Sequence, residues 1–344
     1  MSHCKLSSII IAIAASICLI SCKKDDETTV SPSLDGALSF NVPAYVLPNT
    51  KVTMTPSGVE HPDGEEIGYY WKVTPSMRKS DTTRFQSGLD KNGNPSDGSF
   101  TFTFPDTLQT YTVNGYAYAK GYSYSMETLT CKVVEGGIDN SITNLGLADR
   151  NVATINGKTY PYVTINGIDW LCRNISDESA GAPYDNYKVM SDVFGGYYSY
   201  EEAMTICPEG WRLPTDAEWT AVVEAYDNKI AAMMGNGYFN DELMWEYWPA
   251  VGDINNASGL SLIPVGYSIL SSKATEPQQN EHIDGSYPQA QFKGYTEYAV
   301  FWTADKVAEE EGMAYYRYII CDQPDFMLGK GDTRAFGASV RCVR

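Results

Sequence analysis

Short stretches of alternating apolar and polar residues dominate the chain from residue 37 to residue 134. Phe100, Phe102 and Phe104 recur at every second position, as a strand with one buried face requires. The same alternation predicts strands over residues 37–42, 51–55, 67–74, 99–104, 110–119 and 125–134. Because no helical pattern separates them, these strands predict an all-β sandwich.

Two buried side chains are expected in this sandwich. Trp71 lies in the third predicted strand, and Cys131 shares one face of the last strand with Leu129 and Val133, so we expect a buried indole and a buried thiol. The stretch Phe104-Pro105-Asp106, followed by Tyr111-Thr112-Val113, resembles the end of a PKD or related immunoglobulin-like module. The resemblance implies a PKD/Ig-like spacer domain over residues 35–135.

The pattern changes after residues 135–137, Glu-Gly-Gly, which predict a domain boundary. Residues 151–172 then contain three short strands separated by Asn156-Gly157 and Asn166-Gly167. Each Asn-Gly pair suits the two positive φ angles of a type I′ hairpin turn. The segment therefore predicts a three-stranded meander.

Two helices are expected next, each opened by a capping box. Ser199 and Glu202 frame a helix from about residue 200, and Thr215 and Glu218 frame a second helix. The chain is then irregular over residues 235–298, and strands return at 299–303, 314–321 and 338–343. Residues 138–344 therefore predict an α+β domain.

The N-terminus predicts export. A charged start and a short apolar run over residues 9–20 fit a signal peptide spanning residues 1–21. Leu19-Ile20-Ser21-Cys22 resembles the lipobox of bacterial lipoproteins, which implies that Cys22 carries a lipid anchor. The acidic run after Cys22 resembles the surface-export signal of Bacteroidetes lipoproteins. Residues 22–34 then form a flexible tether, and the expected location is the outer membrane, lipid-anchored and exposed at the cell surface.

Charge excludes one class of partner. The formal net charge is -18, and no basic stripe is visible, which argues against nucleic acid. Acidic side chains also suit calcium, but no recognisable calcium loop is present, so we expect no cofactor and keep calcium as an alternative. The expected partners are the membrane, through the lipid, and a glycan or protein ligand outside the cell.

Cysteine count and compartment together predict disulfides. Eight cysteines are present; two belong to the signal peptide, Cys22 is the lipid site and Cys131 is the buried thiol. The other four lie in the C-terminal half and are Cys172, Cys207, Cys321 and Cys342. In an oxidising compartment this even set predicts two disulfides, for which three connectivities are open. No Cys-x-x-Cys pair is present, which argues against a zinc site.

Five motifs in the C-terminal half carry a family resemblance. They are residues 163–170 (VTINGIDW), 207–219 (CPEGWRLPTDAEW), 262–266 (LIPVG), 301–303 (FWT) and 339–343 (SVRCV). In this order they resemble the Fibrobacter succinogenes major paralogous domain, which is similar to the C-type-lectin-like superfamily. The resemblance implies a lectin-like fold and a Cys207–Cys342 disulfide, and it leaves Cys172 and Cys321 as the second pair.

Most residues of these motifs are expected to hold the fold together. Large apolar anchors and a capped helix start account for them without a ligand. We expect Arg212 to pair with Glu218 or Asp216. The structural set is Trp170, Trp211, Arg212, Thr215, Glu218, Trp219 and Trp302.

An enzyme is the less favoured class. Residues 212–219 also resemble the RLPTEAEW motif of formylglycine-generating enzymes, but those use a closely spaced cysteine pair, whereas Cys321 and Cys342 lie far apart. Beyond the signal peptide the only histidines are His61 and His282, which argues against a histidine metal cluster or a Ser-His-Asp triad. We therefore expect no catalytic residues.

A binding head is the favoured function, and a structural subunit of a surface adhesive appendage is the alternative. Aromatic side chains on long loops suit sugar stacking or protein contact. The candidate ligand residues are Trp245, Tyr247, Trp248, Tyr267, Tyr287 and Tyr295. Gln323-Pro324-Asp325 resembles the sugar motif of calcium-dependent lectins, but no Trp-Asn-Asp follows, so we assign it no role.

Overall fold

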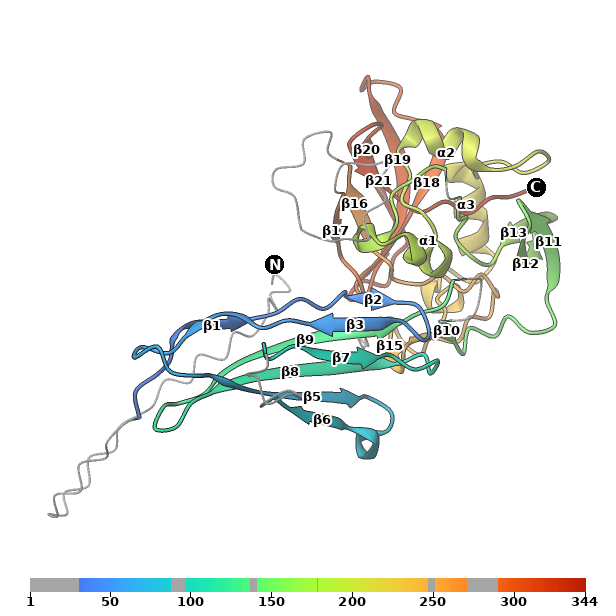
Figure 1. Cartoon of the computed structure of the whole chain (residues 1–344). Coiled ribbons are helices and arrows are strands. Elements are labelled where there is room, and N and C mark those ends of the chain that lie inside the picture. The colour runs from blue at the N-terminus through green and yellow to red at the C-terminus, as the bar shows by residue number, and fades with distance from the viewer. Residues whose placement is uncertain (1–30, 88–96, 137–140, 178, 247–250, 271–289) are drawn as a thin grey trace, which may run out of the picture.

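The computed structural model describes residues 31–87, 97–136, 141–177, 179–246, 251–270 and 290–344, and the fold is mostly β (Figure 1). The elements fall into two parts, each with its own core. One apolar cluster draws all its buried members from between Leu34 and Val133. The other clusters begin at Val134. The change of core therefore lies beside the Glu-Gly-Gly stretch.

In the described residues, the N-terminal part has nine strands and one 3-10 turn, η1 (Lys79–Asp81). The strands are β1 (Asp35–Ser39), β2 (Tyr45–Val46), β3 (Lys51–Met54), β4 (Ser57–Glu60), β5 (Gly68–Pro75), β6 (Thr83–Gln86), β7 (Phe100–Thr103), β8 (Thr110–Tyr118) and β9 (Ser125–Val133). One sheet has the order β2-β9-β8-β5-β6, and two ladders pair β1 with β4 and β3 with β7. All three contribute to one core, as a β-rich sandwich requires.

The six predicted strands of this part correspond to β1, β3, β5, β7, β8 and β9. Trp71 and Cys131 are both fully buried, as expected from their alternation with polar neighbours. Trp71 also donates a hydrogen bond from Nε1 to the carbonyl of Gly98, at 2.8 Å. The prediction missed β2, β4 and β6, which have at most four residues each and too little alternation to detect.

The C-terminal part begins with short ladders and hairpins. These strands are β10 (Ile142–Thr143), β11 (Asn151–Ile155), β12 (Lys158–Ile165), β13 (Ile168–Leu171), β14 (Tyr238–Phe239) and β15 (Glu242–Leu243). β11, β12 and β13 form the predicted meander. Positive φ angles occur at both residues of Asn156-Gly157 and of Asn166-Gly167, so these turns are those expected from the sequence.

Helices cover only short segments of the described chain. They are α1 (Lys188–Phe194), α2 (Tyr200–Ile206) and α3 (Asp216–Glu224), with 3-10 turns η2 (Tyr184–Asn186) and η3 (Ile230–Ala232). Both predicted capping boxes are present: Ser199 with Glu202, and Thr215 with Glu218. Helix α1 was not expected from the sequence, because its N-cap residue Tyr187 makes no side-chain cap.

The remaining strands form two sheets. They are β16 (Tyr267–Ile269), β17 (Gln291–Lys293), β18 (Tyr298–Lys306), β19 (Met313–Ile320), β20 (Met327–Asp332) and β21 (Phe336–Gly337). The sheet orders are β18-β19-β20 and β17-β16-β21. The predicted final strand over 338–343 is wrong as a continuous strand, because its residues bridge separately to Tyr198, Phe301, Arg212 and Trp170. Residues 338–343 therefore pass between several elements and form isolated bridges with each, without a continuous ladder to one strand.

One disulfide, Cys207–Cys342, is described, and it is the one implied by the family resemblance; its Cα atoms are 5.7 Å apart. The predicted Cys172–Cys321 disulfide is wrong, since both are buried thiols. The Cys172 N–H donates to the carbonyl of Pro161 in β12, whereas the Cys321 N–H donates to the carbonyl of Glu297, just before β18. The even number of cysteines in the C-terminal half does not require a second disulfide, because a buried thiol can also pack as a small apolar side chain.

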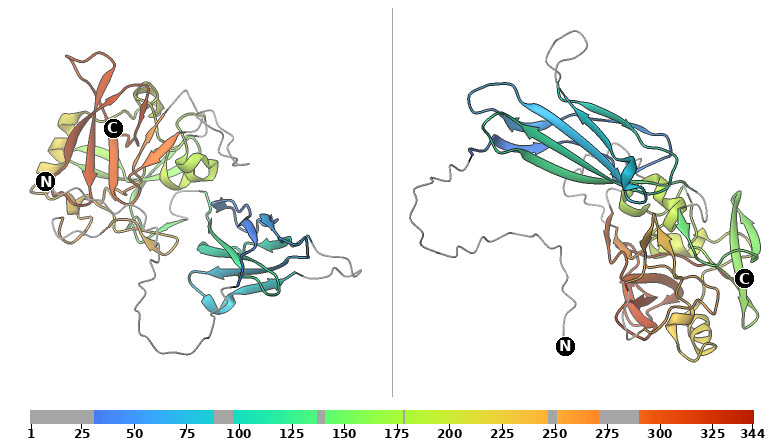
Figure 2. Two further views of the ribbon diagram at one scale, coloured as in Figure 1. Left: turned by 90° about the vertical axis from the view of Figure 1, so that its left-hand side faces the viewer. Right: turned by 90° about the horizontal axis from the view of Figure 1, so that it is seen from below.

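Contacts join the two parts, which lie beside each other in Figures 1 and 2. The ring of Tyr45 packs edge-on against Tyr187, with centroids 5.0 Å apart, and the Ala44 N–H donates to the Tyr187 hydroxyl. Lys132 of β9 pairs with Glu242 of β15 at 2.7 Å. The N-terminal part therefore packs on the C-terminal part through specific contacts.

Among the described residues, no helix combines the length and apolar character needed to span a bilayer.

Candidate ligand-binding groove

The sheet β18-β19-β20 has two chemically different faces. On one face, Phe301 of β18 and Ile319 of β19 belong to the core cluster that contains Trp219 of α3. Side chains alternate along a strand, so Tyr298, Tyr316 and Tyr318 lie on the other face. The register supports this: Tyr318 is paired with Val300, and Tyr316 with Trp302. One face is therefore core, and the other carries half-buried tyrosines.

A second sheet extends this aromatic face. β16 pairs with β21, and this pairing brings Tyr267 close to Phe336. Their rings stack with centroids 5.4 Å apart, and Phe336 stacks on Tyr316 at 4.6 Å. Tyr267 also meets Tyr298 edge-on at 6.0 Å. The result is a continuous set of rings built from strands that are distant in sequence.

Two glycines of β20 make room for these rings. A Cβ on Gly329 would lie 2.3 Å from Cζ of Tyr316, and a Cβ on Gly331 would lie 2.7 Å from the ring of Phe336. Gly329 is the direct cross-strand partner of Tyr316. These glycines let the rings lie flat against the neighbouring strand.

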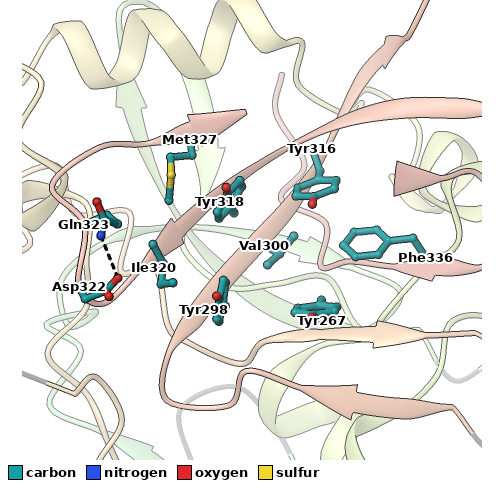
Figure 3. A pocket seen from close by; sticks show the side chains of 10 residues that line it. All are labelled: Tyr267, Tyr298, Val300, Tyr316, Tyr318, Ile320, Asp322, Gln323, Met327 and Phe336. Atoms are coloured by element: carbon teal, nitrogen blue, oxygen red, sulfur yellow. Dashed lines mark hydrogen bonds between the residues drawn. The ribbon is translucent and has the colours of Figure 1, made fainter. Parts of the chain in front are cut away.

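The aromatic face borders a groove of about 560 Å³, shown in Figure 3. This size is typical of small-molecule sites. Asp322 and Gln323 lie at one end of the groove, while Tyr267 and Phe336 lie at the other. The groove is lined by Tyr267, Tyr298, Val300, Tyr316, Tyr318, Ile320, Asp322, Gln323, Met327 and Phe336.

The tyrosine hydroxyls of the groove can form hydrogen bonds with a ligand. Within the described chain, no hydrogen bond is formed by the hydroxyls of Tyr267, Tyr298, Tyr316 or Tyr318. Burial, together with the negative charge of Glu297 and Asp322, raises the pKa of Tyr298 to about 12. Burial also raises the pKa of Tyr316. Both phenols are therefore protonated at neutral pH and can donate hydrogen bonds as well as accept them.

We expect the Gly329→Ala substitution to destabilise the protein by about 1–3 kcal/mol, because the new methyl group overlaps the Tyr316 ring. Urea denaturation would measure the loss. Leu328→Ala, at the exposed neighbouring position, is the matched control. In a Tyr316→Ala background the same glycine change should cost much less, since its obstacle is gone. An equal cost in both backgrounds would contradict the packing explanation.

The candidate ligand residues from the sequence separate in the structure. Tyr267 lies in the groove. Trp245 is 1 % exposed and donates from Nε1 to the carbonyl of Leu262, so its assignment as a ligand residue is wrong. Tyr295 packs on Phe194 and Tyr184 in another cluster, and is therefore also a packing residue. Tyr247, Trp248 and Tyr287 lie outside the described residues, as do Cys22 and His282.

The motif residues hold the fold near the groove. Trp170 and Trp219 are fully buried, with ring centroids 4.6 Å apart. Trp302 is also fully buried, and its Nε1 donates to the Tyr198 carbonyl at 2.7 Å. Trp302 packs edge-on against Phe336, so it supports the groove from beneath.

The helix-capping group behaves as predicted. Of the two carboxylates considered for Arg212, Glu218 is its partner, at 2.5 Å, while Asp216 pairs with Arg317. The hydrogen bonds from Arg212 lower the pKa of Glu218. Trp211, beside this group, is half-buried and stacks under Arg344, whose guanidinium lies 4.6 Å from the ring.

Sequence reasoning missed most of the groove. Four lining residues belong to strands, whereas the ligand residues predicted from the sequence lie in the segment expected to be irregular. These four are Tyr298, Tyr316, Tyr318 and Phe336. One signal was present: Tyr316, Tyr318 and Ile320 recur at every second position, opposite Ile319 on the core face. A strand with apolar residues on both faces indicates that the second face is also covered, either by another part of the protein or by a ligand.

Potential metal ligands and histidines are separated in the described part of the chain. It contains no group of three or more His, Cys, Asp or Glu side chains placed to hold a metal ion. His61 lies in the N-terminal part, where its ring meets Tyr122, far along the chain from the groove residues.

Fold and groove together define a β-rich protein of two parts, in which the C-terminal part carries an open aromatic groove. The model of the Fibrobacter succinogenes major domain matches residues 150–344, and the chain belongs to this family. The match confirms the family predicted from the five motifs.

Other comparisons contribute less. No curated protein matches the chain. One solved structure, of the Yersinia pseudotuberculosis adhesin InvE, is similar over 91% of this chain and 71% of that chain, with 10% sequence identity and a TM-score of 0.24. A likeness of this size carries no functional argument.

Proposed function

We propose that this chain is a non-catalytic surface lipoprotein whose C-terminal part binds glycans in the aromatic groove. In this proposal Cys22 carries the lipid, the N-terminal part is a PKD/Ig-like stalk, and the C-terminal part has a C-type-lectin-like fold. The lipobox resemblance and the tether composition support the anchor. Location at the outer membrane surface follows from the same sequence features.

The observation that carries the binding function is the row of tyrosine rings with unused hydroxyls. Sugar rings present apolar C–H faces and a rim of hydroxyl groups. Aromatic faces bury the former, and phenol, carboxylate and amide groups bind the latter. Tyr298 and Tyr318 lie nearly parallel, at 25° and 6.3 Å between centroids, next to the polar end formed by Asp322 and Gln323. This combination suits a sugar better than a purely apolar ligand.

A glycan array probed with the soluble chain from residue 25 onward tests the proposal, followed by calorimetry on the sugars that bind. We expect Tyr318→Ala to weaken binding about tenfold or more, equivalent to ~1.4 kcal/mol, because it removes a central ring of the groove. Tyr315→Ala is the matched control: it changes the same strand but lies outside the groove lining.

Two results would count against a glycan site. The first is an array without any signal, together with an unchanged melting temperature in the presence of the sugars. The second is a sugar that binds equally well to the wild-type chain and to the Tyr318→Ala variant, since its site would then lie elsewhere.

A further inference from the structure

The groove has an uneven charge distribution. Among the described residues, its lining contains one carboxylate, Asp322, and no lysine, arginine or histidine. Glu297 lies close enough to act with Asp322 on the pKa of Tyr298. The whole chain carries a formal charge of -18. Negative charge therefore concentrates at the end of the groove where Tyr298 and Tyr318 lie.

Among the described residues, the nearby cations have partners or positions elsewhere. Arg317 of β19 alternates with Tyr316 and Tyr318, so it lies on the opposite face, where it pairs with Asp216. Lys330 of β20 pairs with Glu310. Lys293 of β17 is the cross-strand partner of Tyr267, at the end of the groove away from Asp322.

The carboxylate itself is available to a ligand. Asp322 is half-buried, and the contact described for its side chain is one long hydrogen bond, in which Gln323 Nε2 donates at 3.4 Å. A short hydrogen bond to a carboxylate would be well under 3 Å. An ammonium group placed beside Asp322 would thus gain a carboxylate partner without displacing a strong internal bond.

Aromatic rings add to the preference for a cation. The faces of tyrosine rings carry negative potential and attract ammonium groups within about 6 Å of the ring centroid. Tyr298 and Tyr318 lie beside the Asp322 end in Figure 3. A carboxylate next to two such rings favours a cation over a neutral group and disfavours an anion.

We propose that the groove binds amino sugars, with the sugar ring on the tyrosine faces and its ammonium group at Asp322. The inference rests on the proposed glycan-binding function and specifies its ligand class. A neutral sugar would occupy the rings and offer the carboxylate only uncharged hydroxyl groups. An acidic sugar would be repelled from this end of the groove.

Calorimetry with three probes of equal length tests the inference: glucosamine tetramer, its fully N-acetylated form, and an acidic oligogalacturonate tetramer. At slightly acidic pH, where the amines are protonated, we expect the glucosamine tetramer to bind about tenfold tighter than the acetylated form. Added salt should reduce this preference, since the groove is open to solvent and its charges are screened.

Two variants locate the effect. Asp322→Asn should lower the affinity for the glucosamine tetramer more than the affinity for the acetylated tetramer, and so remove the preference for the amine. Asp325→Asn, at an exposed position outside the groove lining, should change neither. Thermal melting of each variant confirms that it is folded. The salt series on the wild-type chain tests, without any substitution, whether the preference for the amine is electrostatic.

The outcomes separate the two proposals. Equal affinity for the amine and its acetylated form, or tighter binding of the acidic tetramer, would overturn the amino-sugar inference and leave the glycan groove standing. No binding of these probes, together with a blank glycan array, would overturn both. A preference that survives Asp322→Asn would move the ammonium site away from Asp322 and contradict the inference.

Discussion

Replacing both Cys207 and Cys342 by alanine is expected to lower the free energy of unfolding by ~5 kcal/mol. The disulfide joins residues 135 positions apart, and a cross-link of that length removes much of the conformational freedom of the unfolded chain. Cys342 is fully buried in the cluster that contains Trp302 and that packs against the groove tyrosines. Its loss should therefore loosen the floor of the groove as well.

Urea denaturation followed by tryptophan fluorescence measures this loss. Reducing agent should destabilise the wild-type chain by a similar amount and leave the double alanine variant unchanged. Peptide mapping under non-reducing conditions should show Cys207 linked to Cys342, with Cys172 and Cys321 alkylated after denaturation. A loss below about 1 kcal/mol, or a disulfide between Cys172 and Cys321, would contradict the structure.

Arg341→Met is expected to cost ~3–5 kcal/mol, because several buried acceptors would each lose a hydrogen bond from a charged donor. Arg341 is fully buried, and it donates hydrogen bonds to Leu171 and Leu260, which belong to two different apolar clusters. Its Nε donates to Asn174 Oδ1 at 2.7 Å, and its terminal nitrogens donate to the carbonyls of Leu171, Leu260 and Ser261. Methionine would leave four acceptors without this donor.

Charge and geometry of Arg341 can be separated experimentally. Burial lowers the pKa of the guanidinium to about 9, so Arg341 is still charged at neutral pH. Arg341→Lys keeps a charge but loses the planar fork of donors, so we expect an intermediate loss of stability. Arg212→Met is the surface control; its ion pair with Glu218 is half exposed, and we expect a cost of about 1 kcal/mol or less. Equal costs for Arg341→Met and Arg212→Met in urea denaturation would contradict the buried network.

Features fixed by neighbouring residues were predictable. The Asn-Gly turns of the meander depend on two consecutive backbone conformations, and the capping boxes at Ser199 and Thr215 depend on residues three positions apart. Alternation along a strand placed Trp71 and Cys131 in the core for the same local reason. Arg212 and Glu218 are likewise only six residues apart, and Glu218 lies in the first turn of α3.

Features that depend on distant segments were harder to predict. The Cys207–Cys342 pairing came from the family resemblance, and the count of cysteines wrongly supplied a second disulfide. Trp245 sits on a loop that the sequence marks as irregular, yet this loop folds inward and buries the indole. Irregular backbone and exposure are separate properties, and the sequence pattern reports only the first.

By itself, the sequence determined most of the longer strands, the Asn-Gly turns and two helix caps, because these depend on side chains within a few residues of one another. It also carried the family motifs and the features from which the lipid anchor is proposed. The tertiary structure decided the groove: Tyr267, Tyr316 and Phe336 come from three strands that meet only when β16, β19 and β21 are assembled. Their contact is set by sheet register and by the space left at Gly329, and neither can be obtained from local patterns.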